Sequence, residues 1–180
     1  VCITGNIAQR KKLIESIPEY DVVITSYDYI RRDYELYKDY QFYYFILDEA
    51  QYIKNQSTKN AQTVKLINGK YRFALTGTPI ENSLAELWSI FDFLMPQYLY
   101  NYHHFKETYE IPIIKNEDQQ KQAKLKQLVE PFILRRTKKD VLTELPDKIE
   151  NNVIIPFTPE EEKVYLANLS TINSELQSAI

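Results

Sequence analysis

Two short apolar segments, each followed at once by polar residues, most constrain the fold of this chain. Residues 42–47 read FYYFIL and lead directly into Asp48 and Glu49, and residues 72–75 lead into Thr76. Uninterrupted apolar runs of this length are typical of strands buried in a parallel sheet. Polar residues after such strands meet at the carboxyl edge of the sheet, where α/β folds bind ligands. We therefore predict an α/β fold with a ligand site at that edge.

Other segments extend this α/β pattern. Strands are also predicted where short β-branched stretches are bounded by turn or charged residues, at residues 1–4, 21–26 and 153–155. Helices are predicted where a capping residue precedes apolar residues at helical spacing, after Ser57, Ser83 and Thr158. Gly69 is expected to end the first of these helices, and a charged, glutamine-rich helix is expected over residues 117–126. The order of elements in the first half predicts right-handed βαβ units, with helices covering both faces of the sheet.

Composition limits the classes of protein to which the chain can belong. With a net charge of −3 over 180 residues, the chain lacks the overall basic surface of a bulk electrostatic nucleic-acid binder, so any such contact is local. The single cysteine, Cys2, excludes an internal disulfide and a cysteine-based zinc site, and it fits a reducing intracellular compartment. Residues 42–47 are far shorter than the roughly 18 apolar residues that span a bilayer, so no membrane partner is expected.

The polar residues after the two apolar segments suit phosphate hydrolysis. At the carboxyl edge, Asp48 would hold Mg²⁺, directly or through water, and Glu49 would orient or deprotonate the water that attacks a γ-phosphate. The turn of Thr76, Gly77 and Thr78 could switch partners between the carboxylates and another segment. Each motif alone also has a plainer interpretation: a solvated acidic pair that caps the next helix, and an ordinary strand-to-helix turn. Their occurrence in this order, each after a buried strand, favours a nucleotide-driven motor.

These and further motifs closely resemble those of the Snf2-type ATPases of helicase superfamily 2. The resemblance rests on DVVITSY at 21–27, ILDEAQYIKN at 46–55, ALTGTPIEN at 74–82 with ELW at 86–88, FDFL at 91–94, and LRRTK at 134–138 with LP at 145–146. It covers roughly residues 20 to 170, and its motifs are specific in both sequence and order.

The resemblance implies a parallel-sheet, RecA-like (P-loop NTPase) lobe that is truncated at its N-terminus. On this interpretation residues 1–96 form part of lobe 1, and residues 97–180 form a helical C-terminal extension that leads to lobe 2. The implied protein is a DNA-dependent ATPase that uses ATP and Mg²⁺, translocates on double-stranded DNA and remodels protein–DNA complexes. Its expected partners are double-stranded DNA, the second RecA-like lobe of the same chain and a DNA-bound protein target. Its expected location is intracellular, in a bacterial cytoplasm or nucleoid or in a eukaryotic nucleus.

The resemblance also assigns roles to individual residues. Asp48 and Glu49 correspond to the magnesium and water residues of motif II, here a DEAQ box, with Asp48 and Gln51 at the nucleotide. Thr76, Gly77 and Thr78 correspond to the coupling motif III. The implied nucleic-acid contacts are Thr25, Ser26, Lys54, Arg135, Arg136 and Lys138. The basic cluster at 135–139 can neutralise phosphates, but ion pairs with Asp140 and Glu144 are an equally good explanation of it.

Gln51 departs from the histidine that many relatives carry at this position. Its amide still offers a donor and an acceptor, so coupling is retained while this position contributes less pH dependence. His103 and His104 lie outside every motif and are interpreted as surface or packing residues.

The phosphate-binding loop G-x-x-x-x-G-K-[ST] does not occur in this sequence. Gly69 and Lys70 are followed by Tyr71, and Val64 stands where the first glycine belongs. The chain is therefore interpreted as the middle of a longer protein, and residues 1–180 alone are expected to have negligible ATPase activity. Two alternatives stay open for the whole protein. One is a non-catalytic DNA- or protein-binding module, and the other is an RNA helicase of the same superfamily, which the LRRTK segment disfavours.

Overall fold

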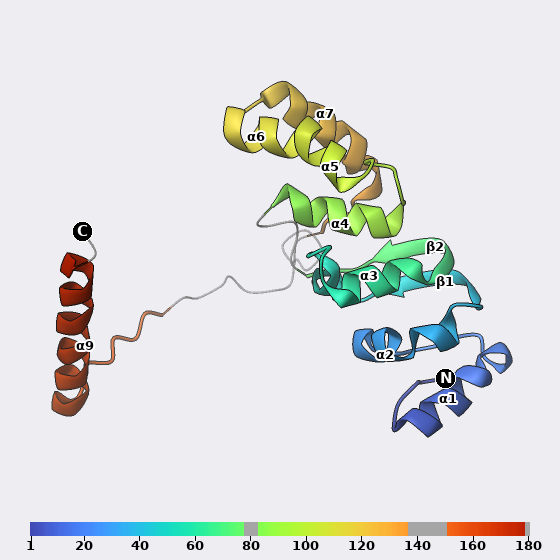
Figure 1. Cartoon of the computed structure of the whole chain (residues 1–180), viewed down its shortest axis with the longest axis horizontal. Coiled ribbons are helices and arrows are strands. Elements are labelled where there is room, and N and C mark those ends of the chain that lie inside the picture. Colours follow the sequence, from blue (N-terminus) through green and yellow to red (C-terminus); the bar gives the residue numbers. More distant parts are fainter. Residues whose placement is uncertain (78–82, 137–150, 179–180) are drawn as a thin grey trace. The chain divides into compact units, whose positions relative to one another are not determined.

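The computed structural model describes residues 1–77, 83–136 and 151–178 (Figure 1). It divides into two compact units, Val1–Ile133 and Leu134–Ile180, which are described separately. In the described part of the chain, no helix is both long and apolar enough to cross a membrane.

A parallel βαβ unit forms the centre of the first unit. Strand β1 (Gln41–Leu47) pairs with β2 (Asn68–Ala74) in parallel, with Tyr44 opposite Tyr71 and Leu47 opposite Ala74. The connection runs through the 3-10 turn η2 (Ala50–Ile53) and helix α3 (Lys59–Leu66). Both strands that were predicted around the ligand site are therefore present, and the second begins four residues earlier than predicted.

The predicted strands at residues 1–4 and 21–26 lie side by side but form only a short contact. Cys2 and Ile24 make an isolated parallel bridge, in which the Ile3 N–H donates to the Ile24 carbonyl and the Ile24 N–H donates to the Val1 carbonyl, each at 2.8 Å. Their direction agrees with the predicted parallel sheet, whereas their length does not make a regular strand.

Helices make up most of the remaining described structure. In the first unit these are α1 (Ile7–Glu15), η1 (Ile17–Glu19), α2 (Tyr27–Tyr37), α4 (Leu84–Leu94), α5 (Tyr102–Phe105), the π-helical segment η3 (Lys106–Glu110), α6 (Ile111–Asn116), α7 (Gln119–Val129) and η4 (Glu130–Phe132). The second unit contains α9 (Pro159–Ser178). The charged helix predicted at 117–126 corresponds to α7, which Asp118 caps.

Two of the predicted capping residues are correct. The Ser83 hydroxyl accepts a hydrogen bond from the Glu86 N–H and begins α4. At the start of α9, the Thr158 N–H donates to the Glu161 carboxylate at 2.8 Å, and the Glu161 N–H donates back to the Thr158 hydroxyl at 3.3 Å. This reciprocal pair is a capping box, and it satisfies two N–H groups that the first helical turn leaves unpaired.

Three local predictions are wrong. Thr58, not Ser57, caps α3, because the Ser57 hydroxyl instead donates to the Asn55 side chain at 2.7 Å. Gly69 does not end this helix, since α3 stops at Leu66 and Gly69 already pairs with Phe42 in the sheet. Residues 153–155 form no strand, and their side chains are exposed. A β-branched stretch needs a partner strand to become one, and these three residues pair with none in the described part of the chain.

Two hydrophobic cores lie in the first unit, and α4 contributes to both. One core surrounds the sheet and includes Ile14, Leu47 and Val64, together with Phe93 of α4. The other joins the helices after the sheet and includes Trp88 and Phe91 of α4, with Leu87, Leu99, Phe105, Tyr109, Leu125 and Val129. A helix that is apolar around most of its circumference is stable only when buried on several sides. Helix α4 therefore connects the β-sheet to the helical region.

The two faces of the sheet are not equally covered. On one face the rings of Phe45 and Phe93 pack together, with their centroids 5.4 Å apart. On the same face the Arg72 guanidinium donates to the carbonyls of Phe93 and Ile67 at 2.9 and 2.8 Å. Burial lowers the pKa of Arg72. The opposite face keeps four large side chains 44 to 56% exposed: Tyr44, Ile46, Tyr71 and Phe73. The expected two-sided cover is therefore not met by the described residues, because the side chains that meet the core alternate along each strand.

Candidate functional site

The loop after β1 is joined directly to the end of β2. The Leu75 N–H donates to the Leu47 carbonyl, and the Ala50 N–H donates to the Leu75 carbonyl, both at 2.8 Å. These two bonds extend the sheet by one residue and bring residues 48–49 beside residues 75–76. The polar residues that follow the two strands therefore lie together at the carboxyl edge.

Asp48 and Glu49 present exposed carboxylates between two buried residues, Leu47 and Ala50. The Asp48 carboxylate accepts a hydrogen bond from the Glu49 N–H at 2.9 Å. Glu49 itself adopts the left-handed conformation, with φ 49° and ψ 52°. This conformation costs a non-glycine residue about 1 to 2 kcal/mol, and in the described chain Gln97, Tyr100 and Glu117 also have a positive φ.

Gln51 connects the carboxylate loop to the segment after β2. Its side-chain N–H donates to the Glu49 carboxylate at 2.7 Å, and its side-chain carbonyl accepts from the Thr76 hydroxyl at 3.0 Å. A carboxylate only accepts, so the two ends of the amide cannot exchange roles without losing the bond to Glu49. The structure thus links three of the sequence-predicted residues into one chain of hydrogen bonds.

The carboxylate loop could offer Mg²⁺ one protein ligand, the Asp48 carboxylate. In the described part of the chain, no group of three or more acidic, histidine or cysteine side chains is close enough to enclose a metal ion. Mg²⁺ is often bound by one or two carboxylates, with substrate phosphates and water completing the shell. The exposed Asp48 carboxylate keeps acceptor positions beyond its bond to the Glu49 N–H, so it fits this mode of binding.

The predicted nucleic-acid residues of the first unit lie at two places. Thr25 and Ser26 immediately precede α2, where the Ser26 hydroxyl caps the helix by accepting from the Tyr29 N–H at 3.3 Å. Lys54 follows η2, and its Nζ forms an ion pair with the Glu86 carboxylate of α4 at 3.4 Å. Ser26 is exposed and Lys54 is close to half exposed, so both are accessible to a ligand.

The predicted basic cluster belongs to the second unit. Arg135 and Arg136 are exposed and lie in neither a helix nor a strand. Thr78 and Lys138 lie outside the described residues, as do the alternative partners of the cluster, Asp140 and Glu144.

Comparison with known proteins identifies the family. The family model described as the SNF2-related domain matches residues 1–179. The chain belongs to this family. A solved structure of the Sulfolobus solfataricus SWI2/SNF2 ATPase core in complex with dsDNA is 40% identical and has a TM-score of 0.71. The match covers 99% of this chain and 37% of that one, which confirms the predicted α/β, RecA-like fold class.

Curated relatives of this SNF2-related domain are much longer than the chain. An uncharacterized ATP-dependent helicase of Mycoplasma genitalium is 38% identical over 165 residues, which are 92% of this chain and 16% of that protein. The human TATA-binding protein-associated factor 172 is 36% identical over 173 residues, which are 90% of this chain and 9% of that protein. The chain therefore spans less than a fifth of the length of these relatives.

The structure also brings a tyrosine to the carboxylate loop, and no sequence motif assigned a role to it. The Tyr27 hydroxyl donates to the Asp48 carbonyl at 2.8 Å, and its ring lies 5.4 Å from the ring of Tyr52. Burial, with smaller contributions from Asp48, Glu49 and Tyr52, raises the pKa of Tyr27 to about 12. Tyr27 is the last residue of the DVVITSY segment, directly after Thr25 and Ser26. Nothing in the sequence indicates that its side chain contacts the loop after β1.

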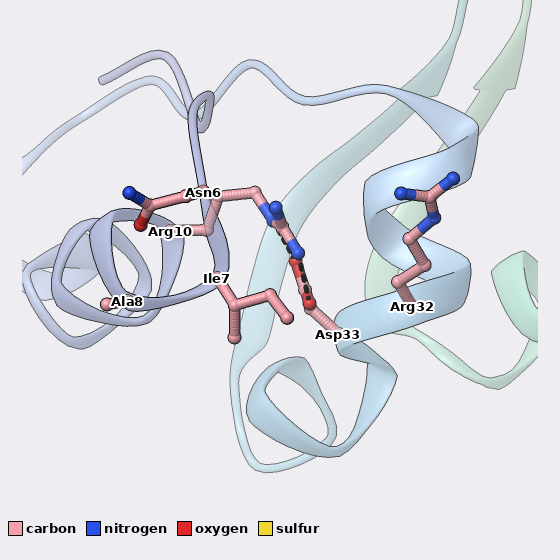
Figure 2. Close-up of a pocket in the computed structure, with 6 residues that line it drawn as sticks. All are labelled: Asn6, Ile7, Ala8, Arg10, Arg32 and Asp33. Carbon is pink, nitrogen blue, oxygen red and sulfur yellow. Dashed lines mark hydrogen bonds and ion pairs between the residues drawn. The ribbon is translucent and has the colours of Figure 1, made fainter.

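A surface hollow beside α1 has a structural explanation (Figure 2). Its lining residues are Asn6, Ile7, Ala8, Arg10, Arg32 and Asp33. Arg10 is buried and donates to both carboxylate oxygens of Asp33, and it also donates to the Gly5 carbonyl at 2.8 Å. This bidentate pair joins α1 to α2 and neutralises both charges, as buried ion pairs require.

Proposed function

We propose that this chain supplies the hydrolytic carboxylates and part of the DNA-binding surface of an ATP-driven motor that moves on double-stranded DNA. The observation that carries the proposal is the Glu49–Gln51–Thr76 chain of hydrogen bonds at the carboxyl edge of a parallel sheet. The names of the relatives support the activity, since one is an ATP-dependent helicase and the structural neighbour is an ATPase core bound to dsDNA.

In this proposal the two carboxylates have separate tasks. Asp48 would hold Mg²⁺, and the ion would supply positive charge that offsets the charge of the ATP phosphates. Glu49 orients the attacking water and accepts its proton, and the bond from Gln51 keeps the carboxylate aimed. Thr76 donates to Gln51, which in turn donates to this carboxylate, so a movement of Thr76 would be passed through Gln51 to Glu49. A Cβ added at Gly77 would meet no atom of the described residues within 4 Å.

The proposed DNA contacts use two kinds of surface. Thr25 and Ser26 stand at the N-terminus of α2, where unpaired N–H groups and the helix dipole favour a phosphate. Arg135, Arg136 and Lys138 add local positive charge to an otherwise acidic chain. Lys54 would leave Glu86 to reach a phosphate, and partly exposed pairs of this kind contribute only about 0 to 1 kcal/mol.

The domain assignment is also part of the proposal. Residues 1–96 would form part of a RecA-like first lobe, and residues 97–180 a helical extension towards a second lobe of the same protein. The sheet-centred core and the helical core share α4 and support two structural parts within residues 1–133, whereas the compact units divide after Ile133. A protein bound to the DNA would be the object that the motor remodels.

The test measures ATP hydrolysis by the full-length protein, with and without duplex DNA, beside its Glu49→Gln variant. We expect duplex DNA to stimulate hydrolysis, and we expect the variant to bind nucleotide but to hydrolyse it at least about a thousandfold more slowly. Glu107→Gln, which alters an exposed glutamate of η3, is the matched control and should hydrolyse ATP normally.

Each other outcome has a definite meaning. Normal turnover by Glu49→Gln would remove Glu49 from the proposed chemistry. Stimulation by duplex RNA instead of duplex DNA would favour an RNA helicase. No hydrolysis by the unaltered protein would leave a non-catalytic DNA- or protein-binding module as the better description.

A further inference from the structure

The peptide group between Asp48 and Glu49 is bound on both of its sides. Its N–H, which belongs to Glu49, donates to the Asp48 carboxylate at 2.9 Å. Its carbonyl, which belongs to Asp48, accepts from the Tyr27 hydroxyl at 2.8 Å. The orientation of this one peptide plane therefore depends on a side chain that lies 21 residues earlier in the sequence.

This peptide plane controls the direction of both carboxylates. Its N–H side fixes the Asp48 side chain, and its rotation would change the backbone angle φ of Glu49. Glu49 is already in the left-handed region, which is unfavourable for a residue with a side chain. A strained conformation persists only where surrounding contacts hold it, and the Tyr27 hydroxyl is one of those contacts.

Tyr27 is itself held firmly. It is the first residue of α2, its side chain packs against the sheet-centred core, and its ring contacts that of Tyr52 beyond the carboxylates. A phenol hydroxyl carries its proton at neutral pH, so Tyr27 can donate this bond there. The donor is thus present whenever the site would work.

We infer that Tyr27 is a positioning residue for ATP hydrolysis, which sets the Asp48–Glu49 peptide so that both carboxylates point into the site. This inference rests on the proposed function. Because Tyr27 directly follows Thr25 and Ser26, the same residue joins the proposed phosphate-contact segment to the carboxylate loop. It acts through the backbone of Asp48 and Glu49.

The test is Tyr27→Phe in the full-length protein, because phenylalanine keeps the ring and removes only the donor. We expect kcat for DNA-stimulated hydrolysis to fall about tenfold, with KM for ATP and the half-saturating duplex concentration changed less than about twofold. The number of nucleotide-binding sites per chain, titrated with a fluorescent ATP analogue, should not change. Tyr34→Phe removes a hydroxyl from the same helix two turns later and should leave kcat unaltered.

The controls separate failure of this inference from failure of the proposed function. If the unaltered protein hydrolyses ATP, Glu49→Gln does not, and Tyr27→Phe has the unaltered kcat, only the inference about Tyr27 is overturned. A fall in kcat matched by an equal loss of nucleotide-binding sites would also overturn it, because Tyr27 would then merely support folding. If the unaltered protein does not hydrolyse ATP at all, the proposed function and this inference both fail.

Discussion

The carboxylate loop and the described part of the basic cluster, Arg135 and Arg136, differ in how many contacts restrain them. The loop is restrained by two backbone bonds with Leu75, by the Tyr27 hydroxyl and by the Gln51 amide. Arg135 and Arg136, in contrast, are exposed and belong to neither a helix nor a strand.

This difference agrees with the tasks that we propose for the two regions. Hydrolysis needs a carboxylate held close to one position and direction, since small misplacements of a catalytic group cost large factors in rate. Attraction of a phosphate backbone depends mainly on the number of positive charges near it and much less on their exact geometry. A rigid loop and an open basic segment are therefore both suitable for their parts of one motor.

The largest effect that would sharpen this comparison is expected at Gln51. Gln51→Ala removes the bond that aims the Glu49 carboxylate, so kcat should fall about tenfold to a hundredfold while KM for ATP changes little. Steady-state kinetics of the full-length protein would measure this. Gln62→Ala, at an exposed site on α3, is the control. An unaltered kcat in Gln51→Ala would mean that the loop does not need this restraint.

A smaller effect, on binding rather than on rate, is expected in the basic segment. Arg135→Ala combined with Arg136→Ala should weaken duplex DNA binding and lower the slope of log affinity against log salt by about 2, because each phosphate contact contributes about 0.9. The value of kcat at saturating DNA should not change. The double variant Lys124→Ala, Lys126→Ala on α7 removes the same charge elsewhere. Equal salt slopes in the unaltered protein and the arginine variant would remove this segment from the DNA contacts.

The smallest expected effect is on the melting temperature at alkaline pH, and it tests the environment of the Tyr27 hydroxyl. The pKa of Tyr27 is raised from 10.0 to about 12, so between these values the unfolded chain releases a proton that the folded chain retains. The stability that this group contributes is complete below pH 10 and is lost as the pH rises through about 12. As the pH rises from 9 to about 11.5, the melting temperature of Tyr27→Phe should fall less steeply than that of the unaltered protein. Identical pH profiles would show that Tyr27 titrates normally in the folded protein.

Strand β1 and the start of α4 were predictable because each depends on local sequence. An uninterrupted apolar run predicts β1 to within one residue, and Ser83 with Glu86 predicts the beginning of α4. The strand prediction for residues 153–155 was wrong because a strand needs a partner, and β-branched residues alone do not supply one. Gly69 misled it for a similar reason, since the sheet begins where the helix pattern alone suggested a cap.

For the site, the order of the motifs was enough to bring Asp48, Glu49 and Thr76 to one edge of the sheet. The ion pair of Lys54 with Glu86 and the bond from Tyr27 to Asp48 were not predictable in this way. Both depend on how α2 and α4 pack around the loop, and no spacing in the sequence encodes that. The roles of Thr78 and Lys138 stay predictions, because both residues lie outside the described structure.

At Glu49, the residue that would best suit the backbone conformation differs from the residue that the proposed ATP hydrolysis needs. Glycine would occupy φ 49° without steric cost, so a protein selected for thermal resistance alone would gain by carrying glycine there. The same exchange would remove the carboxylate that we propose as the proton acceptor. Directed evolution that rewards melting temperature alone would therefore favour loss of this carboxylate, and position 49 should be held constant in any such programme.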